Sequence, residues 1–283
     1  MKPAFYSLLM ATSVLAEDSR GGFAERIAAL EKLHGGRLGI SVLDTSTGRR
    51  LEYRASERFA MCSTFKALLV GAVLALVDTG GESLERWVPY GRADLLEYAP
   101  IAKAHLGEGG MRVGALCSAA VEYSDNTAAN LLLARVGGPP GLTTYLRGLG
   151  DTVTRLDRDE PTLNTDIPGD PRDTTTPAAM VGLLERILLG NALSSTSRAR
   201  LFAWMERVNT GRDRLRAGLP STWRVGDKTG TCGPGTLNDL AIAWPPGRAP
   251  VLIAVYSTHL NGGIEAGSAA LAEVARVVVS AFG

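Results

Sequence analysis

The sequence contains few residues of the kinds that build metal or redox centres. Three histidines and three cysteines are spread along its 283 residues: His34, His105, His259, Cys62, Cys117 and Cys232. None has C-x-x-C or paired-histidine spacing, so neither a zinc nor an iron–sulfur site is predicted, and no metal is expected. The net charge is only +1. It gives no electrostatic reason to expect nucleic acid or an anionic membrane as a partner.

Long apolar runs are also few. Apolar residues make up 45% of the chain and charged residues 21%, as in a soluble globular protein, and no stretch after the N-terminal segment is a convincing membrane span. In that segment, Lys2 precedes mostly apolar residues 4–15, and Val14-Leu15-Ala16 resembles a small-residue cleavage site. We interpret residues 1–16 as a Sec-type signal peptide, which predicts a periplasmic protein in a compartment that permits disulfides. A frayed N-terminal helix is the alternative.

Apolar periodicity predicts strands and helices at both ends of the chain, with helices between them. Residues 22–33 have helical spacing, and residues 37–44 and 50–54 predict a hairpin. From residue 225 onward the pattern predicts three strands and then a long helix over 263–282. Between about residues 84 and 209 it indicates helices and loops without a strand.

We therefore predict a fold of the α/β (α+β) class. One antiparallel sheet is built from both chain ends and flanked by helices, and an all-helical domain is inserted into it. The expected boundaries are 1–16 for the signal peptide, 17–56 and 207–283 for the two parts of the α/β domain, and 57–206 for the helical domain. A cleft between two such lobes is a natural place for a site.

Ser63-x-x-Lys66 stands at the start of a continuous apolar run, residues 67–77. If a buried helix begins near Ser63, Lys66 lies one turn on and on the same face. A hydroxyl beside an amine at the positive end of a helix can be an activated nucleophile. The alternative is that Ser63 caps the helix and Lys66 lies on the surface, and the motif alone favours it.

Ser124-Asp125-Asn126 precedes a predicted helix over residues 127–135. Because serine and aspartate are common N-caps, capping alone would explain the motif. The functional interpretation makes Ser124 a proton relay and Asn126 a donor to a substrate carbonyl.

A loop rich in proline, aspartate and threonine begins at Arg158 and runs to residue 177. Long irregular loops in compact domains are usually functional or disordered. Glu160 is a candidate general base, and Arg158 and Asp173 carry opposite charges that could join the two ends of the loop. A solvated acidic loop is the alternative.

Lys228-Thr229-Gly230 lies in a predicted strand. The lysine and hydroxyl could bind a carboxylate, and Gly230 would allow a ligand close to the backbone. An exposed edge strand protected by a lysine is the alternative. Lysine is scarce, however: only five occur in the chain, and Lys66 and Lys228 both lie in such motifs.

In this order, Ser-x-x-Lys, Ser-Asp-Asn, a loop with Arg-x-Glu-x-x-Leu-Asn and Lys-Thr-Gly resemble the signature of the class A serine β-lactamases. The resemblance extends from about residue 22 to the C-terminus. It implies hydrolysis of penicillins, cephalosporins and other β-lactams, with resistance to these antibiotics as the result. It also implies no cofactor, small-molecule partners only and a monomer.

The resemblance assigns the catalytic roles. Ser63 attacks the β-lactam carbonyl, and Lys66 or Glu160 (through a water) takes its proton. The backbone N–H groups of Ser63 and Thr231 form the oxyanion hole. Ser124 passes a proton to the departing nitrogen. The substrate-binding positions are then Tyr98, Asn126, Asn164, Arg214, Lys228, Thr229, Gly230 and Thr231.

Cys62 and Cys232 match the disulfide positions of the class A carbapenemases, a subgroup that also has the equivalents of Thr231 and Arg214. By that resemblance we expect a Cys62–Cys232 bridge, a free Cys117 and turnover of carbapenems. The loop after Cys232 looks one residue short, which leaves a narrower-spectrum class A enzyme as the alternative. A DD-peptidase would lack Glu160, a non-hydrolysing β-lactam sensor is normally attached to a membrane segment, and a Ser-His-Asp esterase would need a histidine in a motif.

Overall fold

The structure is a computed structural model that describes residues 22–233 and 235–282. The predicted signal peptide, residues 1–16, lies outside the described residues. No helix within them combines the length and apolar content needed to cross a bilayer.

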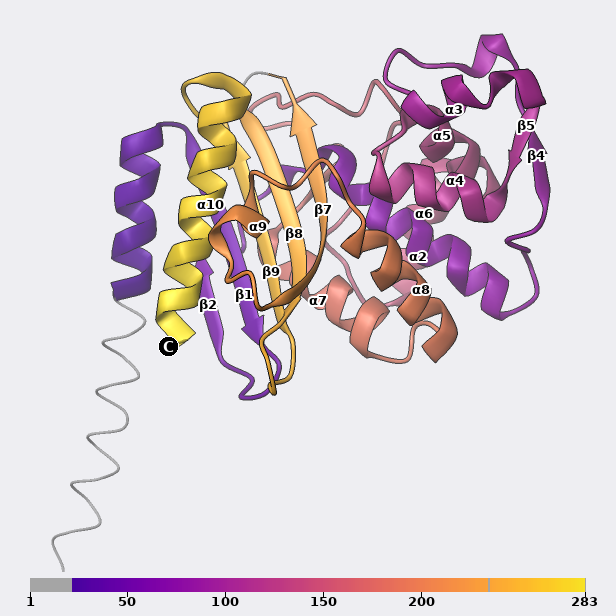
Figure 1. Ribbon diagram of the computed structural model, residues 1–283. Helices are drawn as coiled ribbons and strands as arrows, with labels where there is room; N and C mark the ends of the chain where they lie inside the picture. The colour runs from indigo at the N-terminus through magenta and orange to yellow at the C-terminus, as the bar shows by residue number, and fades with distance from the viewer. Residues whose placement is uncertain (1–21, 234, 283) are drawn as a thin grey trace, which may run out of the picture.

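A five-stranded antiparallel sheet forms one side of the molecule (Figure 1). Its strands are β1 (Arg37–Asp44), β2 (Arg50–Tyr53), β7 (Arg224–Cys232), β8 (Thr236–Trp244) and β9 (Val251–Thr258). They lie in the order β2-β1-β9-β8-β7, so β1 from the N-terminal part pairs directly with β9 from the C-terminal part. The predicted sheet built from both chain ends is confirmed.

Helices cover both faces of this sheet. Residues 22–34 and α10 (Gly263–Phe282) pack on one face, and α7 (Pro177–Leu184) packs on the other, against β1 and β9 (Figure 1). Side chains along β8 therefore alternate between two apolar clusters: Leu240 and Ile242 face the α7 side, whereas Ala241 and Ala243 face α10. With both faces covered, most of β9 and the second half of β8 are continuous apolar runs in the sequence, whereas β7 also contains the charged and polar residues of the Lys-Thr-Gly segment.

The middle of the chain is mainly helical and lies beside the β7 edge of the sheet (Figure 1). Its α-helices are α2 (Phe65–Asp78), α3 (Pro100–Ala104), α4 (Val113–Glu122), α5 (Asn126–Arg135), α6 (Gly138–Gly148), α7 and α8 (Ser195–Glu206), and α9 (Leu215–Gly218) follows them. Short 3₁₀ turns lie at η1 (Cys62–Thr64), η2 (Arg92–Asp94) and η3 (Leu106–Glu108), and a π-helix at η4 (Glu185–Leu189).

The expectation of no strand between residues 84 and 209 was wrong. Strand β4 (Trp87–Pro89) pairs with β5 (Gly110–Arg112), and β6 (Thr174–Thr175) pairs with β3 (Phe59–Ala60). Each pairing is two or three residues long, which is too short to produce a detectable alternation of apolar residues. Such strands form because tertiary packing brings the segments together.

Helix α2 is the central element of the helical region. Its residues from Phe65 to Leu74 are all buried, so it has no polar face. The apolar cluster around it continues into the inner face of the sheet, through residues such as Leu240 and Leu252. The core is therefore continuous across residues 57 and 206, and the domain boundaries placed there stay a prediction.

Gly39 on β1 offers a test of this packing. A Cβ at Gly39 would lie 2.3 Å from Cε2 of Phe59, a ring that is itself held beneath Arg37. We expect Gly39→Ala to lower the free energy of unfolding by about 1–3 kcal/mol, because overpacking a tight core costs that much.

Gly182→Ala in α7 is the matched control, since a Cβ there would meet nothing within 4 Å. It should stabilise the protein by up to about 1 kcal/mol through helix propensity. Urea titrations followed by tryptophan fluorescence measure the free energy of unfolding of both variants. Equal effects of the two substitutions would contradict the packing account.

Candidate active site

The predicted site residues gather in a cleft of about 450 Å³ beside strand β7. It is lined by Ser63, Tyr98, Ser124, Asn126, Asn164, Thr210, Arg214, Thr229, Gly230, Thr231 and Ile264. Lys66, Glu160 and Lys228 lie buried beneath this lining. The sequence did not indicate Thr210 or Ile264. Thr210 Oγ1 lies 2.6 Å from Thr229 Oγ1, and Ile264 is 61% exposed near the start of α10.

Ser63 lies in the turn η1, directly before helix α2, and Lys66 lies in the first turn of that helix. Neither behaves as the capping alternative requires. Ser63 makes no side-chain capping bond, and the Lys66 side chain has no exposed surface. Lys66 Nζ donates to Ser63 Oγ at 3.0 Å. The predicted pairing of hydroxyl and amine is therefore present.

Lys66 Nζ has more acceptors than an ammonium has hydrogens. Besides Ser63 Oγ it lies 2.8 Å from Ser124 O, 2.6 Å from Asn126 Oδ1 and 2.9 Å from Glu160 Oε1. Burial lowers the pKa of Lys66 because it penalises the charged form, and the carboxylate of Glu160 partly opposes this shift. A lysine with a lowered pKa and these neighbours is suited to exchanging a proton with Ser63 or Glu160.

Glu160 is held from two sides. Asn130 on helix α5 binds its backbone reciprocally: Nδ2 donates to Glu160 O at 2.8 Å, and Oδ1 accepts from Glu160 N at 3.0 Å. Asn164 Nδ2 donates to the carboxylate at 2.5 Å. Because Glu160 is only 2% exposed, the solvated-loop alternative is wrong for this residue.

The ends of the loop are joined as the sequence suggested. Arg158 Nε lies 2.6 Å from Asp173 Oδ2, and Asp173 Oδ1 also accepts from the backbone N–H of Arg158 at 2.9 Å. Thr176 caps α7 through the N–H of Ala179 at 3.2 Å, with Pro177 as the first helical residue.

Asn130, which holds the backbone of Glu160, was missed by sequence reasoning. The available signal was its place four residues after Asn126, on the same helix face.

The Ser124-Asp125-Asn126 segment divides its tasks among its three residues. Asp125 is the N-cap of α5, accepting from the N–H of Ala128 at 2.9 Å. Ser124 has a left-handed backbone (φ 58°), and its Oγ accepts from Lys228 Nζ at 3.0 Å. Asn126 N donates to the carbonyl of Tyr98 at 3.0 Å, which places that 51% exposed ring at the cleft mouth. Capping explains only the middle residue.

Lys228 does not protect an exposed edge. Strand β7 is the edge strand of the sheet, but the Lys228 side chain is fully buried and donates to Ser124 Oγ and to Thr229 O. Burial lowers the pKa of Lys228 strongly, and the nearby charge of Lys66 lowers it further. Both lysine amines lie within 3.5 Å of Ser124 Oγ, and an anionic ligand bound there would offset the repulsion between their charged forms.

Gly230 is required by the protein itself. A Cβ there would lie 2.8 Å from Met61 O and 3.2 Å from Cys62 Cβ, so the glycine lets β7 approach the nucleophile turn. The close neighbour is therefore backbone, where the sequence suggested a ligand. Ser63 and the next residue of the strand, Thr231, both line the cleft.

Arg214 is buried against the same strand. Its Nη1 donates to Gly230 O and Asn238 O, both at 2.8 Å, and its Nη2 donates to Thr231 Oγ1 at 2.7 Å. Burial lowers its pKa. Arg214 thus orients the Thr231 hydroxyl while contributing positive charge to the cleft.

The disulfide Cys62–Cys232 is present, with Cα atoms 5.6 Å apart and a sequence separation of 170. Cys117 is free and buried, and burial raises the pKa of its thiol. Asn238 on β8, which sequence reasoning missed, makes a parallel link. Its Nδ2 donates to Ala60 O at 2.9 Å and to Met61 O at 3.2 Å. A polar residue inside an apolar strand was the available signal.

Comparison with known proteins places the whole described chain in one family. A family model described as "Beta-lactamase enzyme family" matches residues 22–282. The chain is 47% identical to the β-lactamase CTX-M-25 of Escherichia coli over 282 residues, covering 100% of this chain and 96% of that protein. It is 46% identical to the carbapenem-hydrolyzing β-lactamase KPC of Klebsiella oxytoca, covering 92% and 89%.

Solved structures agree. An ancestral class A β-lactamase (GNCA) is 59% identical, with a TM-score of 0.90 over 92% of this chain and 100% of that chain. The putative class A β-lactamase PenP of Rhodopseudomonas palustris is 51% identical, with a TM-score of 0.90 over 92% and 99%. Within residues 22–233 and 235–282, no group of three or more histidine, cysteine, aspartate or glutamate side chains could hold a metal ion.

Asn130 provides a test of how Glu160 is held. Asn130→Ala would leave the buried N–H and C=O of Glu160 without their partners, at a cost of about 1–3 kcal/mol per group. We expect a lower melting temperature and at least about tenfold slower turnover of benzylpenicillin, because Glu160 would no longer be fixed. The exposed Asn191, changed to alanine, is the control. Unchanged turnover in Asn130→Ala would contradict this account.

Proposed function

This chain belongs to the class A β-lactamases, enzymes that hydrolyse β-lactam antibiotics, and we propose that its spectrum includes carbapenems and that a water activated by Glu160 completes each turnover. The observation that carries the proposal is the chain of contacts Ser63 Oγ–Lys66 Nζ–Glu160 Oε1, at 3.0 and 2.9 Å. It joins a nucleophile to two groups that can hold its proton.

In the first step, Ser63 Oγ attacks the β-lactam carbonyl carbon. The serine proton passes to Lys66, with which Ser63 is in direct contact, or through a water to Glu160. The oxygen of the tetrahedral intermediate lies between the backbone N–H groups of Ser63 and Thr231. As the C–N bond of the ring breaks, Ser124 supplies a proton to the nitrogen. Its Oγ lies 3.0 Å from Lys228 Nζ and 3.5 Å from Lys66 Nζ, so either lysine can replace that proton.

The second step hydrolyses the ester. Glu160 and Asn164 share a hydrogen bond beside the cleft and hold a water, and the Glu160 carboxylate removes a proton from it as it attacks the ester carbonyl. The proton then returns to Ser63 Oγ as the product acid leaves. Turnover depends on this carboxylate, and a DD-peptidase with the other motifs would lack it.

Substrate is held by groups around the cleft. The substrate carboxylate binds at Lys228, Thr229 and Thr231, with the charge of Arg214 behind them, and Gly230 keeps this strand close to the nucleophile turn. Asn126 binds the side-chain amide of the substrate. The exposed ring of Tyr98 packs against it at the mouth.

The proposal of carbapenem turnover rests on the Cys62–Cys232 disulfide, on Thr231 and Arg214, and on the resemblance to the carbapenem-hydrolyzing enzyme KPC. The disulfide and Asn238 together fix the nucleophile turn to strands β7 and β8. We further propose a periplasmic monomer, exported by the signal peptide at residues 1–16.

Glu160→Ala should separate the two steps. We expect the variant to acylate with benzylpenicillin and then to stay acylated, with turnover lowered by about 10³-fold or more because the base for the water is missing. Intact-protein mass spectrometry detects the added mass. Glu25→Ala, an exposed position in the N-terminal helix, is the control and should turn over normally. Wild-type turnover by Glu160→Ala would refute the assigned mechanism.

Imipenem hydrolysis, followed by absorbance beside benzylpenicillin, tests the carbapenem proposal. We expect multiple turnovers of both substrates. The double variant Cys62→Ser/Cys232→Ser should lose about 2–5 kcal/mol of stability and lose imipenem turnover more than benzylpenicillin turnover. If imipenem acylates the enzyme without being released, the chain is a narrower-spectrum class A enzyme.

A further inference from the structure

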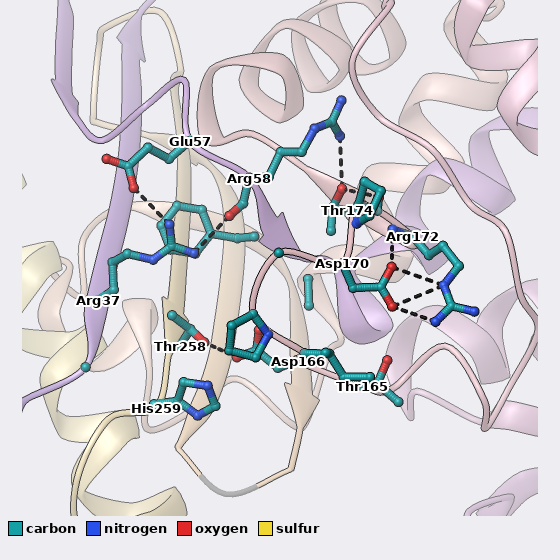
Figure 2. Close-up of a pocket in the computed structure, with 17 residues that line it drawn as sticks. Arg37, Glu57, Arg58, Thr165, Asp166, Asp170, Arg172, Thr174, Thr258 and His259 are labelled. Carbon is teal, nitrogen blue, oxygen red and sulfur yellow. Dashed lines mark hydrogen bonds and ion pairs between the residues drawn. The ribbon is translucent and has the colours of Figure 1, made fainter.

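The outer half of the loop that carries Glu160 stands away from the body of the protein. Residues 165–172 form one wall of a cavity of about 590 Å³, and the other wall comes from residues 36–37, 57–60 and 258–259 (Figure 2). This part of the loop has little apolar packing beneath it. Its position therefore depends on polar contacts: Arg158 Nη2 donates to Thr165 Oγ1 at 2.7 Å at the start of this segment, and other contacts cross the gap.

Asp166 makes such a contact. Its Oδ2 accepts hydrogen bonds from Thr236 Oγ1 at 2.6 Å and from Thr258 Oγ1. Figure 2 shows the Asp166 side chain turned toward Thr258, while Asp170 pairs with Arg172 within the loop. Both threonines are buried, so the donors are fixed, and a carboxylate accepting two hydroxyl donors makes charge-assisted bonds stronger than neutral ones.

The two threonines lie at strand ends next to the catalytic cleft. Thr236 is the first residue of β8 and pairs with Cys232 on β7, and Thr258 is the last residue of β9. On the loop side, Asn164 lies two residues before Asp166, and its Oδ1 is 3.8 Å from Cys232 Sγ. A disulfide sulfur has no hydrogen to donate, so this is a packing contact. Asp166 thus joins the loop to the hairpin whose first strand carries Thr231.

We propose that Asp166 is a positioning residue for the hydrolytic step: by binding Thr236 and Thr258 it holds Asn164 and Glu160 at a fixed distance from strand β7. The inference rests on the proposed function, in which these two residues hold the hydrolytic water. The other two anchors act from the neck of the loop and from the helical side. Arg158 and Asp173 close the neck of the loop, and Asn130 holds Glu160 from the helical side. Asp166 anchors the loop to the sheet.

The consequence is specific to one step. Ser63 and Lys66 are placed by η1 and α2, and their contacts do not pass through Asp166. Loosening the outer loop moves the water and its base relative to the ester, and leaves the nucleophile and its lysine in place. Deacylation should therefore slow while acylation proceeds normally.

The test is pre-steady-state kinetics with benzylpenicillin on Asp166→Ala, Asp166→Asn and Asp170→Ala. We expect Asp166→Ala to lower the deacylation rate constant about tenfold or more, because a ~1 Å displacement of a catalytic group can slow a reaction by up to about 100-fold. The acylation rate constant should change less than about twofold. Asp166→Asn should recover most of the loss, since its Oδ1 can accept from both hydroxyls. Asp170→Ala removes the same charge from the same loop without touching the sheet, and should behave as wild type.

Three outcomes decide the matter. Deacylation slowed alone, with rescue by Asp166→Asn, supports the proposal. Equal slowing of both steps, or a lower melting temperature with both rate constants unchanged, overturns it and leaves Asp166 a purely structural residue.

Glu160→Ala, measured in the same experiment, tests the proposed function separately. If that variant turns over normally while Asp166→Ala still slows deacylation alone, the role of Glu160 fails and the placement of Asn164 by Asp166 stands.

Discussion

The site depends on keeping a lysine with no exposed surface in contact with a serine hydroxyl and a carboxylate. Burying an ammonium group is costly unless polar partners replace water, and the Lys66 partners come from three separate segments: Ser63 from the turn before α2, Ser124 and Asn126 from the start of α5, and Glu160 from the long loop. Each segment must be held in place for the lysine to remain buried. Many of the hydrogen bonds and ion pairs around the cleft hold these segments in place.

The sheet side of the cleft is fixed by a second set of buried polar groups. Arg214 binds the carbonyls of Gly230 and Asn238, and Asn238 binds the carbonyls of residues 60 and 61. Together with the Cys62–Cys232 bridge, these bonds fix strand β7 against the nucleophile turn. The oxyanion hole that we propose needs two N–H groups from different elements at a constant separation, so this rigidity has a direct chemical purpose.

The loop between residues 158 and 173 has one side chain, Leu163, in the apolar core, and is otherwise fixed by polar contacts at points along its length. An ion pair closes its neck, Asn130 holds Glu160, and Asp166 reaches the sheet across a cavity. A loop held by a few polar bonds can shift with small changes in sequence. Substitutions there can alter turnover without disturbing the apolar core.

The sequence by itself determined the class of fold and pointed to the chemistry. Ser63, Lys66, Ser124, Glu160 and Lys228 were recognisable because they lie in four short motifs whose order resembles that of one enzyme family, although each motif alone had a simple structural explanation. The strands and helices were recognisable from apolar runs. Only the tertiary structure decided what surrounds these residues. Asn130, Asn238 and Asp166 act on segments from 30 to more than 170 residues away, and the pairing of β4 with β5 joins segments too short to have a pattern. Local spacing carries no information about such contacts, because they arise only when distant segments pack together.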